Sequence, residues 1–163
     1  MTIQNELERL AKYLPLEKLM DKVNPPLKLL PENPTHILPS IVISGDGLTL
    51  SSVLLVTNKY LCDVALTDPT VSFDLVAKDT VRNYRFRLWT HDIKEGDVLK
   101  TRFEVAEIQL LHVLMGPGGG LTTRITYAGD DRDAWLKRVL EAIPLTLILE
   151  TREGTTIWEP PKR

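Results

Sequence analysis

The N-terminal part of the chain repeats its apolar residues at helical spacing. These residues are Ile3, Leu7, Leu10, Ala11 and Leu14, followed after Pro15 by Leu16, Leu19, Met20 and Val23. The period and the proline predict two short helices, or one kinked helix, over residues 3–23. We expect this apolar stripe to pack against the core. The alternative is a helix that binds a partner or a second copy of the chain.

Prolines dominate the next segment, residues 24–40. They are Pro25, Pro26, Pro31, Pro34 and Pro39. Each proline lacks a backbone N–H and biases the residue before it toward extended geometry. The segment is therefore predicted to be a linker that crosses the surface. Leu27, Leu29 and Leu30 favour packing on the domain over a polyproline ligand for another protein.

From position 41 the apolar period changes to two, which is typical of β-strands. The predicted strands cover residues 41–43, 48–56, 60–66, 71–75, 84–88, 99–105, 108–115 and 121–127. In one of them Tyr84, Phe86 and Leu88 alternate with Arg85 and Arg87. Such alternation predicts a sheet with one buried face and one solvated face.

A glycine-rich run, GPGGG at residues 116–120, precedes the last of these strands. A phosphate-binding loop needs a helix after its glycines, usually with a Lys-Ser/Thr pair. Here residues 121–127 alternate as a strand, and no such pair follows. We therefore interpret the run as a flexible hairpin turn, with an anion-binding or mobile loop as the alternative.

The C-terminal helix has the clearest signals in the chain. Asp130 or Asp131 can cap its N-terminus, and Pro144 should end it. Its apolar stripe consists of Trp135, Leu136, Val139, Leu140 and Ile143. The apolar segments LTLILE and TTIW then flank Arg152, Glu153 and Gly154, which predicts a terminal hairpin.

These elements predict an α+β fold: a bent antiparallel sheet or split barrel of about seven strands, capped by the C-terminal helix. Residues 1–40 form an N-terminal helical arm and proline-rich linker, residues 41–143 the β domain with its capping helix, and residues 144–163 a C-terminal hairpin extension. The pattern contains no internal repeat and no second domain.

The composition limits the classes of binding partner and the cellular compartment that we expect for the protein. The 20 basic and 22 acidic residues give a net charge of −2, which argues against a nucleic-acid-binding protein. One cysteine excludes an internal disulfide and a cysteine-rich zinc site. The N-terminus lacks the basic start and apolar run of a secretory signal, and the apolar runs are too short for a transmembrane segment. We expect a cytoplasmic protein.

No catalytic motif is evident. The histidines, His36, His91 and His112, are too far apart for a helical metal-binding pair. His112 lies in an apolar strand and is expected to be a hydrogen-bonded core or edge residue, and Cys62 is expected to be a buried, inert thiol. We expect no enzyme activity, no metal and no cofactor.

Positive charge is concentrated between residues 82 and 102, a segment that contains six basic and three acidic residues. If the strands on either side of the HDIKEGDV loop pair, Arg85, Arg87, Lys100 and Arg102 are expected to share one face of the sheet. Such a face could hold phosphates or the acidic residues of a partner. The alternative is a solvated strand face whose charges prevent aggregation.

Three segments resemble bacterial pleckstrin-homology-like and GRAM-type domains. LLVTNKYLCDV resembles their strand–turn–strand segment, VAEIQLL a later strand, and AGDDRDAWLKRVLEAI the closing helix of a bent seven-stranded barrel. The resemblance covers residues 41–143. It departs from the family at Glu107, where Asp or Ser is usual, and in a longer insertion between Leu66 and Val105.

The resemblance implies a ligand-binding or protein-interaction module. Some members of the family bind phosphoinositides through basic residues near the first hairpin loop. Here the corresponding loops offer only Lys59, which counts against inositol-phosphate binding.

We therefore expect a non-catalytic binding or assembly module that contacts a protein partner or a second copy of itself. One alternative is binding of an anionic lipid headgroup or phosphate by Arg85, Arg87, Lys100 and Arg102. A second alternative is a small-ligand barrel or unrecognised enzyme with His112 and Tyr127 in a cavity.

Overall fold

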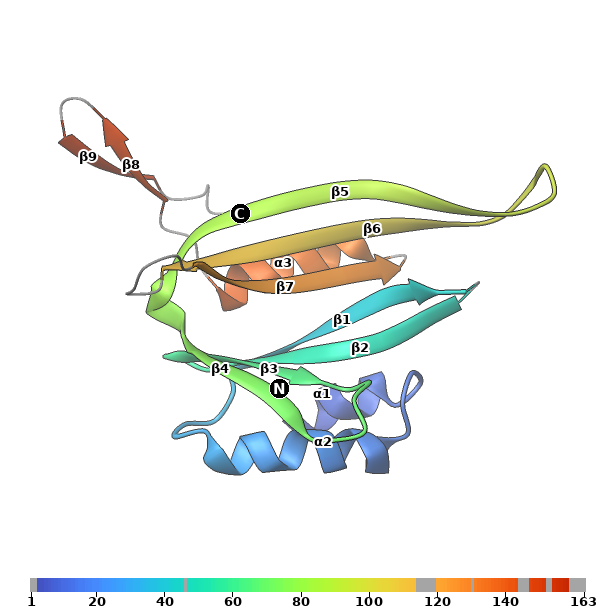
Figure 1. Ribbon diagram of the computed structural model, residues 1–163, viewed down its shortest axis with the longest axis horizontal. Helices are drawn as coiled ribbons and strands as arrows, with labels where there is room; N and C mark the ends of the chain where they lie inside the picture. The colour runs from blue at the N-terminus through green and yellow to red at the C-terminus, as the bar shows by residue number, and fades with distance from the viewer. Residues whose placement is uncertain are drawn as a thin grey trace.

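The computed structural model describes residues 3–45, 47–113, 120–129, 131–143, 147–151 and 154–158 and shows the predicted α+β fold (Figure 1). Within these residues, seven strands form one sheet. They are β1 (His36–Ser44), β2 (Gly47–Val56), β3 (Tyr60–Ala65), β4 (Ser72–Ala77), β5 (Val81–Glu95), β6 (Val98–Val113) and β7 (Gly120–Gly129). A short 3-10 turn, η1 (Lys78–Thr80), joins β4 to β5.

The described strands follow the order β4-β3-β2-β1-β7-β6-β5, so β4 and β5 are the edges and the sheet does not close. Every neighbouring pair is antiparallel except β1 and β7, which are parallel and matched at Ile41 and Tyr127. The sheet is therefore mixed rather than antiparallel throughout. Figure 1 shows its two halves, β1–β4 and β5–β7, diverging from this junction.

The N-terminal segment forms two helices, α1 (Ile3–Leu10) and α2 (Leu16–Leu29), as the pattern around Pro15 predicts. They lie against β1 and β3, respectively. The prediction of a linker from residue 24 is wrong, because α2 continues through Pro25 and Pro26. These prolines cannot donate helical hydrogen bonds, but their fixed φ suits a helix. Burial of Val23 and Pro26 offsets the lost bonds.

β1 also begins earlier than predicted, at His36, and includes Pro39. The N–H and C=O groups of one strand residue point to the same side of the strand. The carbonyl of Pro39 accepts a hydrogen bond from Trp135 Nε1, so its missing N–H lies on the side away from β2. Pro39 therefore removes no hydrogen bond from the β1–β2 ladder. Residues 36–40, which were predicted to be part of an extended linker, form the start of a strand.

α3 (Arg132–Ala142) packs on β1, β6 and β7. Trp135 Nε1 donates to the carbonyl of Pro39 at 3.0 Å, and Arg138 Nη2 donates to the carbonyl of Ile37 at 3.2 Å. Both carbonyls lie on the side of β1 that faces β7 at Ile41. α3 thus supplies the hydrogen bonds along the part of β1 from which β7 has diverged.

Asp131 is the residue before α3, but its carboxylate does not cap the helix. It accepts a hydrogen bond from the hydroxyl of Tyr127 instead. The predicted terminal hairpin is present as β8 (Leu147–Thr151) and β9 (Gly154–Trp158), which pair antiparallel. The predicted turn at residues 116–119, the alternative cap Asp130 and the helix stop at Pro144 lie outside the described residues.

Candidate binding sites on β5 and between α1 and α3

Among the described strands, β5 is an edge of the sheet. Phe86 and Leu88 lie opposite Ile108 and Ala106, which are fully buried, yet they are themselves 44% and 56% exposed. The sheet face that carries Phe86, Leu88 and Ile108 was expected to be buried. It is buried on β6 but not on β5, because α3 lies over β1, β6 and β7. Phe86 and Leu88 instead line one side of a groove of about 410 Å³, and Leu136 and Leu140 of α3 line the other.

The β5–β6 hairpin also extends past the end of β7. β7 ends opposite Glu104, so among the described strands residues 91–103 of β5 and β6 pair only with each other and form a two-stranded extension (Figure 1). Exposed apolar side chains occur near its turn at Val98 and Leu99, and Trp89 precedes it. The turn consists of Gly96 and Asp97, with Gly96 at φ +64°, a conformation that glycine adopts without steric cost.

The four predicted site residues do not share a face. In the pairs Arg85–Gln109, Arg87–Glu107 and Asp92–Arg102, odd-numbered residues pair with odd-numbered ones and even with even. On both strands, odd-numbered residues here therefore lie on one face of the sheet and even-numbered residues on the other. Arg85 and Arg87 therefore lie on one face and Arg102 on the other. The prediction of one face is wrong because the short turn sets a register that the sequence does not specify.

Arg102 is already engaged by a carboxylate. It donates to both oxygens of Asp92, at 2.6 and 3.0 Å. The hydrogen bond and positive charge of Arg102 lower the pKa of the Asp92 carboxyl. Lys100 lies in the register shift next to the turn, between the pairs Ile93–Thr101 and Lys94–Leu99.

A third arginine joins Arg85 and Arg87. Arg124 of β7 lies opposite Gln109, which in turn lies opposite Arg85, so the two arginines flank one β6 residue. We call Arg85, Arg87 and Arg124 the arginine face. The sequence offers no signal for Arg124, because it stands alone among Leu, Thr and Ile and joins the others only through register.

Glu107 is the counter-ion of the arginine face. Its Oε1 lies 3.9 Å from both Arg87 Nη1 and Arg124 Nε, and Gln109 Nε2 donates to it at 2.9 Å. The Arg87 and Arg124 side chains remain 64% and 61% exposed. Two long ion pairs to one carboxylate leave most donors of these guanidinium groups facing solvent.

His112 and Cys62 behave as predicted. His112 is buried, and its Nδ1 and Nε2 lie 3.0 and 2.8 Å from the hydroxyls of Thr80 and Thr123. Burial lowers the pKa of His112. Cys62 is also buried, and burial, with a smaller contribution from Asp63 and Asp74, raises the pKa of its thiol to about 11. The thiol therefore stays protonated at neutral pH.

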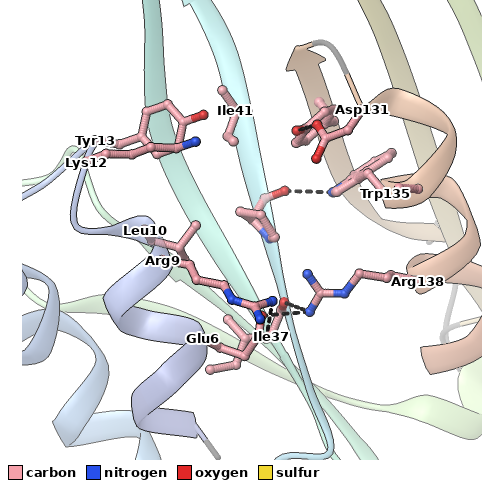
Figure 2. Close-up of a pocket in the computed structure, with 13 residues that line it drawn as sticks. Glu6, Arg9, Leu10, Lys12, Tyr13, Ile37, Ile41, Asp131, Trp135 and Arg138 are labelled. Atoms are coloured by element: carbon pink, nitrogen blue, oxygen red, sulfur yellow. Dashed lines mark hydrogen bonds and ion pairs between the residues drawn. The ribbon is translucent and has the colours of Figure 1, made fainter. Parts of the chain in front are cut away.

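A cleft of about 340 Å³ lies between α1 and α3 (Figure 2). Ile37, Pro39 and Ile41 of β1 line it, and Tyr127 lies at one end, stacked on Trp135 with 5.2 Å between ring centroids. His112 does not line this cleft, so it and Tyr127 do not meet there.

A cluster of ionised side chains closes the other end of the cleft. The Glu6 side chain is only 9% exposed and contacts Arg138 Nη2 at 2.8 Å and Arg9 Nη1 at 3.3 Å. A second pocket, of about 240 Å³, lies on the far side of this cluster and shares Glu6, Ile37 and Arg138 with the cleft. One groove therefore runs along β1 between the two helices, bridged by the Glu6–Arg138 ion pair.

The described residues contain no group of three or more His, Cys, Asp or Glu side chains placed to hold a metal ion. None of the described helices has the length and apolar character needed to span a bilayer. No protein-family model, curated protein or solved structure matches the chain.

Proposed function

We propose that this chain is a non-catalytic binding module that takes up an extended segment of a protein partner along β5. The observation that carries the proposal is the exposure of Phe86 and Leu88 on an edge strand, beside a groove that α3 completes. The proposed compartment is the cytoplasm, which suits a chain with one cysteine and no internal disulfide.

The geometry of β5 supports strand addition. β5 has 15 residues, and among the described strands it pairs with β6 alone. A partner strand on its free side would form main-chain hydrogen bonds and direct alternate side chains into the groove between β5 and α3. The same edge could pair with a second copy of the chain, which is self-association by the same contact.

The order of elements supports the resemblance to pleckstrin-homology-like domains. Seven strands precede a helix that packs on the sheet, as expected for a bent sheet with a closing helix. We therefore propose membership of that group and, with it, a role in protein interaction.

A photo-crosslinking residue at position 88 tests this function. p-Benzoylphenylalanine in place of Leu88 is expected to give covalent protein adducts in the cells that produce the chain, and the adduct mass distinguishes a foreign partner from a second copy. The same residue in place of Val71, which is 45% exposed near the other edge, is the matched control. No adduct at position 88, or equal adducts at both positions, would contradict the proposal.

Anion binding by the arginine face is a second candidate function. It is favoured by Arg87 and Arg124, whose side chains are more than half exposed and share one distant carboxylate. Binding to phosphatidylserine vesicles and to inorganic phosphate, each across a salt series, tests it and separates a lipid headgroup from a free phosphate. Binding that weakens steeply with salt supports this candidate, and no binding at low salt removes it.

A further inference from the structure

The two faces of β5 differ in their chemistry. Phe86 and Leu88 line the groove beside α3. Arg85 and Arg87 alternate with them and therefore lie on the opposite face of the strand. Both arginines are exposed. Over residues 85–88, the edge strand thus presents apolar groups to one side of the sheet and cations to the other.

The arginine face carries more positive charge than its carboxylate balances. Glu107 lies 3.9 Å from both Arg87 and Arg124, so one carboxylate is shared by two cations. Arg85 makes no ion pair within the described part of the chain. Arg85 and Arg87 lie on the edge strand, whereas Arg124 lies on β7, behind β6 (Figure 1). An anionic group that approaches along the edge therefore meets Arg85 and Arg87.

The groove on the other face selects for apolar groups and not for charge. Its two charged lining residues, Asp133 and Lys137 of α3, have opposite signs, and its other lining residues are apolar. The charge preference of an occupant of this edge is therefore set by the arginines, and its apolar groups are accepted by the groove.

A strand that adds to β5 shares both of these faces. Residues that lie directly opposite each other on neighbouring strands point to the same face of the sheet. In an added strand, the residues opposite Phe86 and Leu88 point toward the groove, and those opposite Arg85 and Arg87 point toward the arginines. Because side chains alternate along a strand, the complementary partner has apolar and acidic residues in alternation.

A second copy of β5 does not provide this complement. Two identical antiparallel strands in one sheet are related by a two-fold axis perpendicular to the sheet, which keeps equal faces on the same side. Two copies joined at β5 therefore bring the Arg85 and Arg87 side chains of both onto one face, where like charges are destabilising. Charge complementarity favours a foreign acidic segment over self-association.

We propose that the segment bound along β5 is an extended peptide in which apolar residues alternate with aspartate or glutamate. This inference rests on the proposed strand addition to β5. The apolar side chains of the segment enter the groove beside Phe86 and Leu88, and its carboxylates contact Arg85 and Arg87. Main-chain hydrogen bonds to the edge give affinity, and charge-assisted hydrogen bonds from the arginines select acidic segments.

Isothermal titration calorimetry with end-blocked peptides at physiological ionic strength tests this preference. The acidic alternating peptide is GEVEVEVG. Its counterparts are GQVQVQVG, which is neutral, GKVKVKVG, which is cationic, and GEEEVVVG, which has the same composition without the alternation. We expect saturable binding of GEVEVEVG and about tenfold weaker binding of GQVQVQVG, the effect of losing one charge-assisted hydrogen bond. GKVKVKVG and GEEEVVVG should bind no better than GQVQVQVG.

Two arginine variants locate the carboxylates of the peptide. Arg85→Gln and Arg87→Gln are each expected to reduce the preference for GEVEVEVG over GQVQVQVG about threefold, with binding of GQVQVQVG unchanged. Arg124→Gln is the matched control, because it removes a cation from the same face. Its strand lies about 15 Å from a strand added to β5, beyond the Debye length, so the preference should stay the same.

Equal binding of GEVEVEVG and GQVQVQVG, equal or tighter binding of GKVKVKVG or GEEEVVVG, or no binding of any peptide overturns this inference. A preference that survives in both Arg85→Gln and Arg87→Gln also overturns it. The photo-crosslinking adducts at position 88 decide the proposed function separately. Foreign adducts together with any of these results remove the acidic partner and keep strand binding, and the absence of adducts removes both. Adducts of a second copy alone overturn the inference in favour of self-association.

Discussion

Glu6 and Arg138 form a 2.8 Å ion pair across 132 positions of the chain. Arg138 also donates to the carbonyl of Ile37, so this one guanidinium contacts α1 and β1 from its place on α3. Leu7 and Leu10 of α1 are buried in the core beside this contact. The N-terminal helix is thus held to the sheet by apolar packing and by one side chain of the last helix.

We expect Glu6→Gln to lower the free energy of unfolding by about 1–2 kcal/mol. The substitution replaces a largely buried carboxylate by a neutral amide, which is a weaker partner for Arg9 and Arg138. Urea denaturation measures the change. Glu8→Gln is the matched control, since Glu8 is exposed and accepts a hydrogen bond from Gln4 on the same helix, and it should change stability by less than about 0.5 kcal/mol. Equal losses at the two positions would show that the Glu6 contacts have no special role.

Asp63 should make the protein less stable as pH rises from about 4 to about 6. Burial, with the charge of Asp74, raises the pKa of its carboxyl to about 6. The folded state then binds this proton more tightly than the unfolded state, so the stabilisation present at low pH is lost as pH passes through the folded pKa. Asp63→Asn is expected to gain about 1–2 kcal/mol at pH 7.5 and to gain nothing near pH 4. Urea denaturation at both pH values checks this; an equal gain at both would contradict it.

His112 should act in the opposite direction. Burial lowers its pKa, so the unfolded state takes up this proton more readily and stability falls as pH drops below the ordinary histidine value of about 6.5. Thr123→Val removes the hydroxyl next to Nε2 and should cost about 1–2 kcal/mol at pH 7.5 in thermal or urea unfolding. Thr122→Val, at the exposed neighbouring position, is the control. A comparable loss of stability there would show that any Thr→Val substitution in β7 destabilises the protein and would contradict a specific role for the His112 contact.

Two substitutions on the arginine face should change anion binding in opposite senses. Arg124→Gln is expected to weaken binding to phosphatidylserine vesicles at low salt by about three- to tenfold, since one cation is lost. Glu107→Gln should strengthen it, because the counter-ion shared by Arg87 and Arg124 becomes neutral. Vesicle co-sedimentation measures both, with Lys18→Gln on α2 as the distant control. Weaker binding in Glu107→Gln would contradict this arrangement.

Local patterns were sufficient for most elements of the fold. The period of two predicted β2, β3 and β4 closely, and Pro15 marked the gap between α1 and α2. The proline-rich segment misled for two reasons. Pro25 and Pro26 fit a helix whose buried face includes Pro26, and the missing N–H of Pro39 lies on the side of β1 away from β2. Those are properties of the packed neighbours, which a local rule does not contain.

The candidate sites were less accessible to prediction. Arg85 and Arg87 were correctly placed on a strand, but their partner Arg124 and their separation from Arg102 both depend on register. The cleft joins residues from α1 and α3, near opposite ends of the described chain. Nothing in either segment alone indicates that Arg9 and Trp135 line one cavity.

The hydrogen bonds from α3 to β1 also set an order of events during synthesis. β1 can pair with β2 as soon as both have left the ribosome, whereas the carbonyls of Ile37 and Pro39 must wait for Arg138 and Trp135, 101 and 96 residues later. Until then, one side of the first strand stays open to water or to a chaperone. The strand at the centre of the sheet is thus synthesised early but receives two of its hydrogen-bond donors only from the last described helix.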